Sequence, residues 1–312
     1  MDVDVVLLTQ LARHEACSLN LHVDGSTTTY SIEFDPEALT GGGLAPLPRP
    51  SFLAIVSAHV LASYLAREDS TRPDGFIIEG PRAGGHNAPP RGRLVLDDDG
   101  QPVFGPRDAA DLVKVAEIGL PFWLAGGYST SAQVRQARAD GAAGVQVGTL
   151  FAMCAESGLE PATRQEMLSE LAAGRLEVRT DPLASPTGFP FKVASLPGTM
   201  SEPETYAARP RLCDLGYLRI AYETAPGEVG YRCPAEPVDE YVKKGGDIEA
   251  TVGRKCLCNG LTANVGLGQI RRDGYQEVGI ATLGADLDGV THMLAEFPGG
   301  WTAAQAVDFL LR

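Results

Sequence analysis

Short apolar runs alternate with longer segments of helical periodicity between residues 50 and 150. The runs at residues 52–56, 75–79 and 122–125 are nearly continuous in apolar side chains, which is typical of strands buried on both faces of a sheet. Strands that alternate with helices predict an α/β fold with a parallel sheet. The predicted order is strand 52–56, helix 58–67, strand 75–79, helix 106–118, strand 122–125, helix 129–140 and strand 144–147.

Weaker patterns precede and interrupt this region. Residues 3–13 predict a short amphipathic helix, and residues 18–23 and 28–34 predict short strands. Residues 94–104 fit an inserted hairpin that turns at Asp99 and Gly100.

The alternation stops near residue 175. Residues 178–275 are rich in Pro, Gly, Tyr and Cys with only brief apolar runs, so we expect an irregular, loop-dominated segment. Thr302 predicts the N-cap of a helix over Ala303–Leu311. We therefore expect a first part at residues 1–175 and a cysteine-containing extension with C-terminal helices at residues 176–312.

Composition and charge narrow the function classes. The chain has 312 residues, of which 44% are apolar, and this is enough for one large domain or two ordinary ones. A formal net charge of −14 disfavours binding to nucleic acids and anionic membranes. The longest apolar runs are far shorter than the ~20 residues that cross a bilayer, and the N-terminus is acidic where a secretory signal is basic. We expect a cytoplasmic protein without a nucleic-acid or membrane partner.

Glycine-containing segments follow three of the predicted strands. They begin at Gly80, at Gly126 and at Gly148, and the last two run directly into predicted helices. The carboxyl ends of parallel strands are where α/β folds place their sites. Glycine lets backbone N–H groups approach a ligand, and a helix N-terminus attracts an anion. Either glycine turn alone fits an ordinary strand-to-helix connection equally well, whereas the two in adjacent units favour a phosphate site.

His86 is the candidate catalytic residue in the first of these segments. It lies in a Gly84-Gly85-His86-Asn87 loop directly after a strand, where an imidazole can act as a general base near neutral pH. A surface histidine without a chemical role is the competing interpretation.

The three segments together resemble the signature of the nitronate monooxygenase family, also called 2-nitropropane dioxygenases. The matching stretches read Gly80-Pro-Arg-Ala-Gly-Gly-His86, Ala125-Gly-Gly-Tyr128 and Gly144-Val-Gln-Val-Gly-Thr-Leu-Phe151. The match covers roughly residues 50–160, and residues 185–196 resemble the segment that follows the barrel in this family.

The resemblance implies an FMN-dependent TIM barrel and assigns roles to particular residues. Ala83, Gly84 and Gly85 would approach the flavin, and His86 would be the catalytic base. The FMN phosphate would be held by Gly126, Gly127, Gly148 and Thr149. No residue is assigned to a metal.

Four departures from the family pattern indicate a different substrate. Arg82 replaces the acidic residue before Ala-Gly-Gly-His, Pro89-Pro90 follow the histidine, Tyr128 replaces an isoleucine, and Leu150 replaces an arginine.

A (β/α)₈ barrel needs eight strands and about 250 residues, yet only about four βα units precede the irregular segment. We therefore expect the C-terminal four or so units of a TIM-barrel-type α/β fold. Truncation is the favoured explanation, and a partner chain that supplies the other half, or substitution by the extension, are the alternatives. A half barrel exposes sheet edges, so a homo-oligomer is also expected.

The extension contains Cys213, Cys233, Cys256 and Cys258. Four thiolates could hold a metal or an iron–sulfur cluster, but no pair has the two-residue spacing of common zinc knuckles, so free thiols are the preferred interpretation. Cys17 and Cys154 fit buried core positions.

The resemblance implies a flavin monooxygenase that oxidises alkyl nitronates or nitroalkanes with molecular oxygen. The alternatives are a flavin-dependent enoyl-acyl-carrier-protein reductase of the same barrel group and a truncated remnant without catalysis. If the protein is an enzyme, its partners are a small-molecule substrate and FMN. The FMN supplies the redox chemistry, and the protein binds and orients it.

Overall fold

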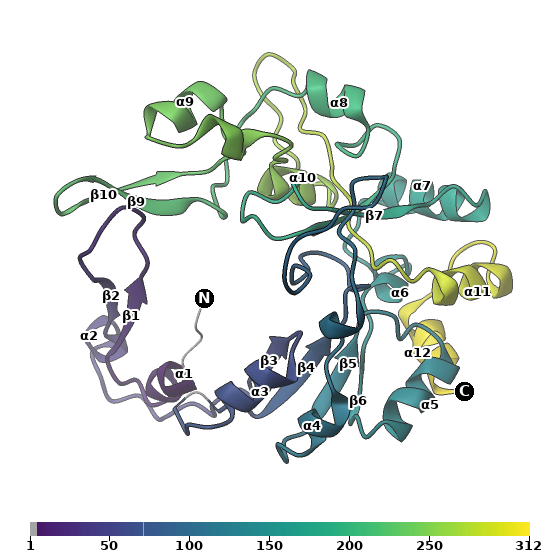
Figure 1. Ribbon diagram of the computed structural model, residues 1–312, viewed down its shortest axis with the longest axis horizontal. Helices are drawn as coiled ribbons and strands as arrows, with labels where there is room; N and C mark the ends of the chain where they lie inside the picture. The colour runs from purple at the N-terminus through teal and green to yellow at the C-terminus, as the bar shows by residue number, and fades with distance from the viewer. Residues whose placement is uncertain (1–4, 71) are drawn as a thin grey trace.

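A four-stranded parallel sheet is the centre of the N-terminal half of the computed structural model, which describes residues 5–70 and 72–312 (Figure 1). The strands are β3 (Leu53–Val56), β4 (Gly75–Glu79), β5 (Phe122–Ala125) and β6 (Gly144–Gln146), and they pair in that order. All four were predicted to within one residue at each end. The α/β class with a parallel sheet is therefore confirmed.

Helices cover one face of this sheet. The register aligns Ala54 with Phe76 and Phe122, and Val56 with Ile78 and Leu124, and all six side chains are buried. They pack against α3 (His59–Leu65), α4 (Leu112–Ala116) and α5 (Ser131–Ala139), which contribute the fully buried Ala62, Val115 and Ala137.

The opposite face of the sheet is partly open. Ile55 is 57% exposed, and its partner Ile77 on β4 and the partner of Ile77 on β5, Trp123, are only partly buried. The expectation that these strands are buried on both faces is wrong within the described residues. Half of the apolar side chains in these strands therefore lie on a face of the sheet that no helix in the described residues covers.

The predicted helix at residues 106–118 is interrupted. A short 3₁₀ turn η1 (Pro106–Asp108) is followed by extended backbone at Ala109, and α4 then begins after Asp111, whose carboxylate accepts a hydrogen bond from the Lys114 N–H. A side-chain cap of this kind starts a new helix. The inserted hairpin predicted at residues 94–104 forms as a short antiparallel pair around its turn. Leu96 bridges Pro102, and the Val103 N–H donates to the Val95 carbonyl.

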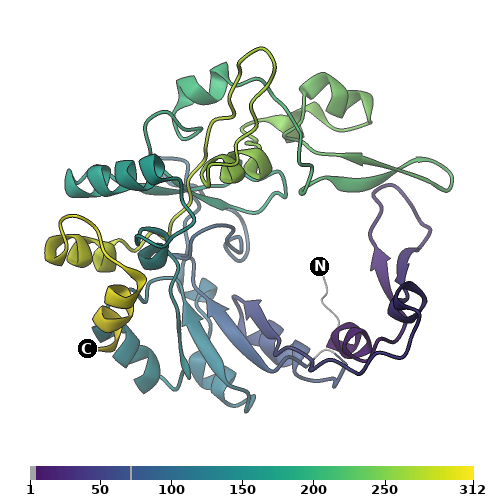
Figure 2. The same cartoon turned by 180° about the vertical axis from the view of Figure 1, so that it is seen from behind.

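Two hairpins from distant parts of the chain meet at one side of the molecule. Figures 1 and 2 show the N-terminal hairpin next to the hairpin of the extension, and Asp24 joins them through a bridge to Tyr222 and an ion pair with Arg232. The N-terminal elements are α1 (Val5–Ala12), β1 (Cys17–Leu21), β2 (Tyr30–Phe34) and α2 (Pro36–Thr40). The helix predicted from residue 3 begins outside the described residues.

Residues 178–275 contain more regular structure than expected. The prediction of a loop-dominated segment is wrong in part, because two antiparallel hairpins and several short helices form there. The hairpins are β7 (Val178–Asp181) with β8 (Phe191–Ala194) and β9 (Ile220–Ala225) with β10 (Glu228–Arg232). The helices are α8 (Pro203–Ala208), α9 (Val238–Lys243), η2 (Ile248–Thr251) and α10 (Leu257–Ala263).

The largest core cluster joins residues from both sides of residue 175. Trp301 is 1% exposed, and its indole N–H donates to the Leu150 carbonyl at 2.9 Å. The surrounding elements are α6 (Thr149–Ala152), α7 (Pro161–Ala172), α11 (Asp288–Glu296) and α12 (Ala303–Leu311). Thr302 caps α12, as predicted, with Gln305 completing a capping box. In the part of the chain with described coordinates, no helix is both long and apolar enough to cross a membrane.

Candidate active site

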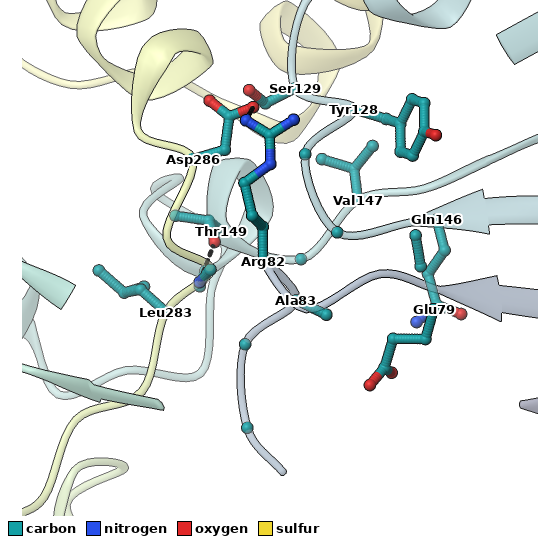
Figure 3. Close-up of a pocket in the computed structure, with 18 of the residues that line it drawn as sticks. Glu79, Arg82, Ala83, Tyr128, Ser129, Gln146, Val147, Thr149, Leu283 and Asp286 are labelled. Carbon is teal, nitrogen blue, oxygen red and sulfur yellow. Dashed lines mark hydrogen bonds and ion pairs between the residues drawn. The ribbon is translucent and has the colours of Figure 1, made fainter. Parts of the chain in front are cut away.

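A pocket of about 350 Å³ lies at the carboxyl ends of β4, β5 and β6 (Figure 3). A parallel sheet directs all its carboxyl ends to one edge, so the three glycine segments meet there. All seven predicted cofactor-binding residues line this pocket: Ala83, Gly84, Gly85, Gly126, Gly127, Gly148 and Thr149.

Close backbone approach explains two of these glycines. Gly126 has a φ of +87°, and a Cβ atom there would lie 2.8 Å from the Ala83 nitrogen. A Cβ atom at Gly84 would lie 2.9 Å from the Leu283 carbonyl carbon. Any side chain at either position would force the pocket walls apart.

Several backbone N–H groups that line the pocket have no acceptor among the described residues. Four of them lie in the two glycine turns, at Gly127, Tyr128, Gly148 and Thr149, and no hydrogen bond from any of these four occurs within residues 5–70 and 72–312. The N–H groups of Ser129 and Thr130, in contrast, donate to the Gln133 side chain and are satisfied. Gly127, Tyr128 and Thr149 are partly buried and Gly148 is exposed, so these donors are open to a bound acceptor such as an anion.

A second wall comes from residues 282–286, which the sequence analysis did not identify. The Gly85 N–H donates to Thr282 Oγ1, and the Gly284 N–H donates to Thr149 Oγ1, each at 2.8 Å. The Ala285 N–H donates to the Arg82 carbonyl at 2.9 Å. Residues 278–283 are mostly apolar and are followed by Gly284, as in the strand-then-glycine pattern of the first wall. This repetition was the signal by which the second wall could have been predicted.

His86 lies just behind the pocket wall. Its Nε2 is 2.6 Å from the Ser185 hydroxyl oxygen, and its ring packs edge-on against Phe191, with centroids 4.9 Å apart. The neighbouring Gly85 lines the pocket, whereas His86 itself does not. Partial burial lowers the pKa of His86, so the imidazole is neutral at physiological pH.

Glu79 is a titratable group on the pocket wall that the sequence analysis missed. It ends β4, and its carboxylate has no hydrogen-bond partner among the described residues. Burial raises its pKa to about 7. With this pKa, the protonation state of Glu79 changes near neutral pH. In the sequence, Glu79 could have been noticed as a carboxyl group at the end of an apolar strand, directly before Gly80.

The cysteines of the extension lie close together. Cys233 and Cys256 are buried in one small cluster, with Cys258 packed against it. Burial raises the pKa of Cys233 to about 12 and that of Cys256 to about 11, so both are protonated thiols. No group of three or more His, Cys, Asp or Glu side chains in the described ranges is arranged to hold a metal ion. Cys17 and Cys154 are buried, as predicted.

The segment that builds most of the pocket is similar in sequence to a known protein family. Residues 50–181 match the sequence profile of the nitronate monooxygenase family. This segment belongs to the nitronate monooxygenase family. The family segment contains β3 to β6 and the loops that carry the predicted cofactor-binding residues and His86.

A curated protein of the same description is also similar in sequence to this chain. The nitronate monooxygenase of Paraburkholderia phytofirmans is 29% identical over 193 residues, which cover 60% of this chain and 49% of the relative. The chain therefore spans about half the length of the relative that it matches.

Solved structures give weaker similarities. FabK from Thermotoga maritima aligns with a TM-score of 0.45 at 18% identity, over 84% of this chain and 60% of that one. A nitroalkane oxidase from Streptomyces ansochromogenes aligns with a TM-score of 0.33 at 25% identity, over 45% of this chain and 37% of that one. These TM-scores are too low to establish a shared fold, and the parallel sheet itself remains the basis for the α/β class.

Proposed function

We propose that the pocket binds FMN and that the protein is a flavin-dependent oxidoreductase acting on alkyl nitronates or nitroalkanes with molecular oxygen. One observation carries this proposal: the three signature segments of the family meet around a single pocket, where backbone N–H groups of two of these segments have no acceptor among the described residues. The family is one of oxidoreductases, and its flavin dependence is the reason for choosing this cofactor.

The residues at the pocket fit the phosphate of FMN. The free N–H groups of Gly127, Tyr128, Gly148 and Thr149 would donate to phosphate oxygens. Gly84 and Gly126, where a Cβ atom would clash, keep the walls close enough for such contacts. When bound, FMN supplies the redox chemistry that the side chains of this site lack.

His86 is our candidate for the base that acts on neutral nitroalkanes. A neutral imidazole nitrogen would accept the α-proton of the nitroalkane, the C–H bond would break, and its electron pair would pass into the nitro group to give the nitronate. The lowered pKa keeps His86 unprotonated at neutral pH, as this role requires. The Ser185 hydroxyl, 2.6 Å from Nε2, would orient the ring.

We also propose that the open face of the sheet is covered by another protein chain. Ile55 on that face is a large apolar side chain that is 57% exposed. Exposed apolar area of this kind marks contact surfaces. Sedimentation of the purified chain at several concentrations tests this, and a monomer at every concentration would argue against a homo-oligomer.

Turnover experiments test the proposed activity. The purified chain supplied with FMN is expected to consume oxygen when an alkyl nitronate is added, and to release nitrite. Oxidation of NAD(P)H that depends on an acyl thioester, without nitronate turnover, would instead select an enoyl reductase. Binding of FMN with neither activity would reject the proposed substrate class for this chain.

A further inference from the structure

Arg82 lies beside Gly127, a pocket residue whose backbone N–H has no acceptor among the described residues. Its guanidinium packs against the backbone of Gly127, where a Cβ atom would come within 3.0 Å of the guanidinium carbon and Nε.

The surroundings of Arg82 leave most of its donors available. Its side chain is 60% exposed, and its ion-pair partner in the described residues is Asp286, with Nη1 and Oδ2 3.5 Å apart. Asp286 is buried and already accepts from the Gln133 side chain at 2.9 Å and from the Asp288 N–H at 3.1 Å. Figure 3 shows the guanidinium next to Asp286 and Ser129. A planar fork with five N–H groups can face the buried carboxylate on one side and a second anion on another.

Charge balance at the pocket points to the same residue. The described lining contains two acidic side chains, Glu79 and Asp286, and Arg82 is its one cation. The whole chain carries a formal net charge of −14. A phosphate monoester would therefore enter a negative environment unless a local cation offset its charge, and Arg82 is placed to do so.

We propose that Arg82 binds the phosphate monoester of the flavin and makes this pocket select FMN over its dephosphorylated form, riboflavin. The inference rests on the proposed function. It adds a side-chain ligand to the backbone donors of Gly127, Tyr128, Gly148 and Thr149.

Equilibrium binding measures this selection directly. The dissociation constants of FMN and riboflavin are measured from quenching of flavin fluorescence for the wild type, Arg82→Ala and Arg82→Lys. Arg82→Ala is expected to weaken FMN binding roughly 10- to 100-fold, the usual effect of losing a charge-assisted contact, and to leave riboflavin binding within about 2-fold. Arg82→Lys keeps the charge without the fork and should fall between the two.

Three controls separate this effect from a general loss of charge or fold. Arg93→Ala removes an exposed arginine that does not line the pocket, and it should leave both dissociation constants unchanged. Added salt should weaken FMN binding to the wild type more than to Arg82→Ala, because an exposed ion pair is screened. Circular dichroism shows whether each variant is folded.

The outcomes distinguish the inference from the proposed function. Equal losses of FMN and riboflavin affinity in a folded Arg82→Ala variant, or no loss of either, would overturn the role of Arg82 while leaving flavin binding intact. If the wild type binds no flavin, the proposed function fails. Stabilisation of the wild type by inorganic phosphate, lost in Arg82→Ala, would then still support the phosphate site, and its absence would overturn the inference as well.

Discussion

The two walls of the pocket differ in how the sequence specifies them. One wall comes from the loops after β4, β5 and β6, where each strand leads directly to its own glycine segment. The other is the segment of residues 282–286, which arrives more than 130 residues later and is held by hydrogen bonds to Gly85, Thr149 and Arg82. The first wall is local in sequence, whereas the second depends on tertiary contacts. A site can therefore have a clear sequence motif in one wall and still need a second wall that has no recognisable motif.

The largest effect is expected from a charge placed in the first wall. Gly126→Asp would put a side chain 2.8 Å from the Ala83 nitrogen and a carboxylate beside the bound phosphate, so we expect loss of FMN binding. Flavin fluorescence titration measures it. Gly299→Asp is the matched control, because Gly299 has open space and no positive φ. Undiminished FMN binding by Gly126→Asp would refute the phosphate assignment.

The second prediction separates cofactor binding from proton transfer. His86→Ala is expected to abolish turnover of neutral nitroalkanes while leaving FMN bound and preformed nitronates oxidised, because only the neutral substrate needs a base. A loss of about 100-fold or more is typical of removing a general base. Steady-state rates with both substrate forms provide the measurement, and equal turnover of neutral nitroalkanes by wild type and variant would reject His86 as the base.

Glu79 provides a smaller, pH-dependent effect on the first wall. Burial raises its pKa from 4.5 to about 7, so the folded state holds the proton more tightly than the unfolded state. This contribution to stability is complete below pH 4.5 and is lost as the pH rises through 7. Glu79→Gln should therefore be more stable than the wild type at pH 8, by about 2 kcal/mol after allowance for partial exposure. Denaturant unfolding at pH 5 and pH 8 tests it, and an identical pH dependence in both proteins would contradict the burial effect.

The smallest effect is expected where the second wall is attached. Thr282→Val keeps the shape of the side chain but leaves the Gly85 N–H without its acceptor, at a cost of about 1 kcal/mol in unfolding free energy. FMN affinity should fall several-fold, since Gly85 lines the pocket. Thr291→Val, which alters an exposed hydroxyl on α11, is the control. Equal FMN affinity in both variants would show that this contact does not shape the site.

Sequence patterns sufficed for the elements whose signals are local. Strands β3 to β6 follow from compact apolar runs, and the Thr302 cap follows from a polar residue before an amphipathic helix. All seven predicted cofactor-binding residues share one pocket because parallel strands end at the same edge.

The remaining features depend on contacts between distant residues. The break between η1 and α4 depends on the capping carboxylate of Asp111, which periodicity does not reveal. The strands β9 and β10 carry polar and apolar residues without a clear alternation. Their partner Asp24 lies almost 200 residues away along the chain. The orientation of His86 toward Ser185, and the segment at residues 282–286, likewise become visible only in the folded chain.

Flavin content is the most direct test of the central claim that the two walls form one FMN site. The purified chain is denatured before and after incubation with added FMN or riboflavin. Any flavin released is quantified by its visible absorption and identified as FMN or riboflavin by chromatography. We expect close to one FMN per chain, with riboflavin retained far less well. A colourless protein that takes up no added FMN would contradict the account.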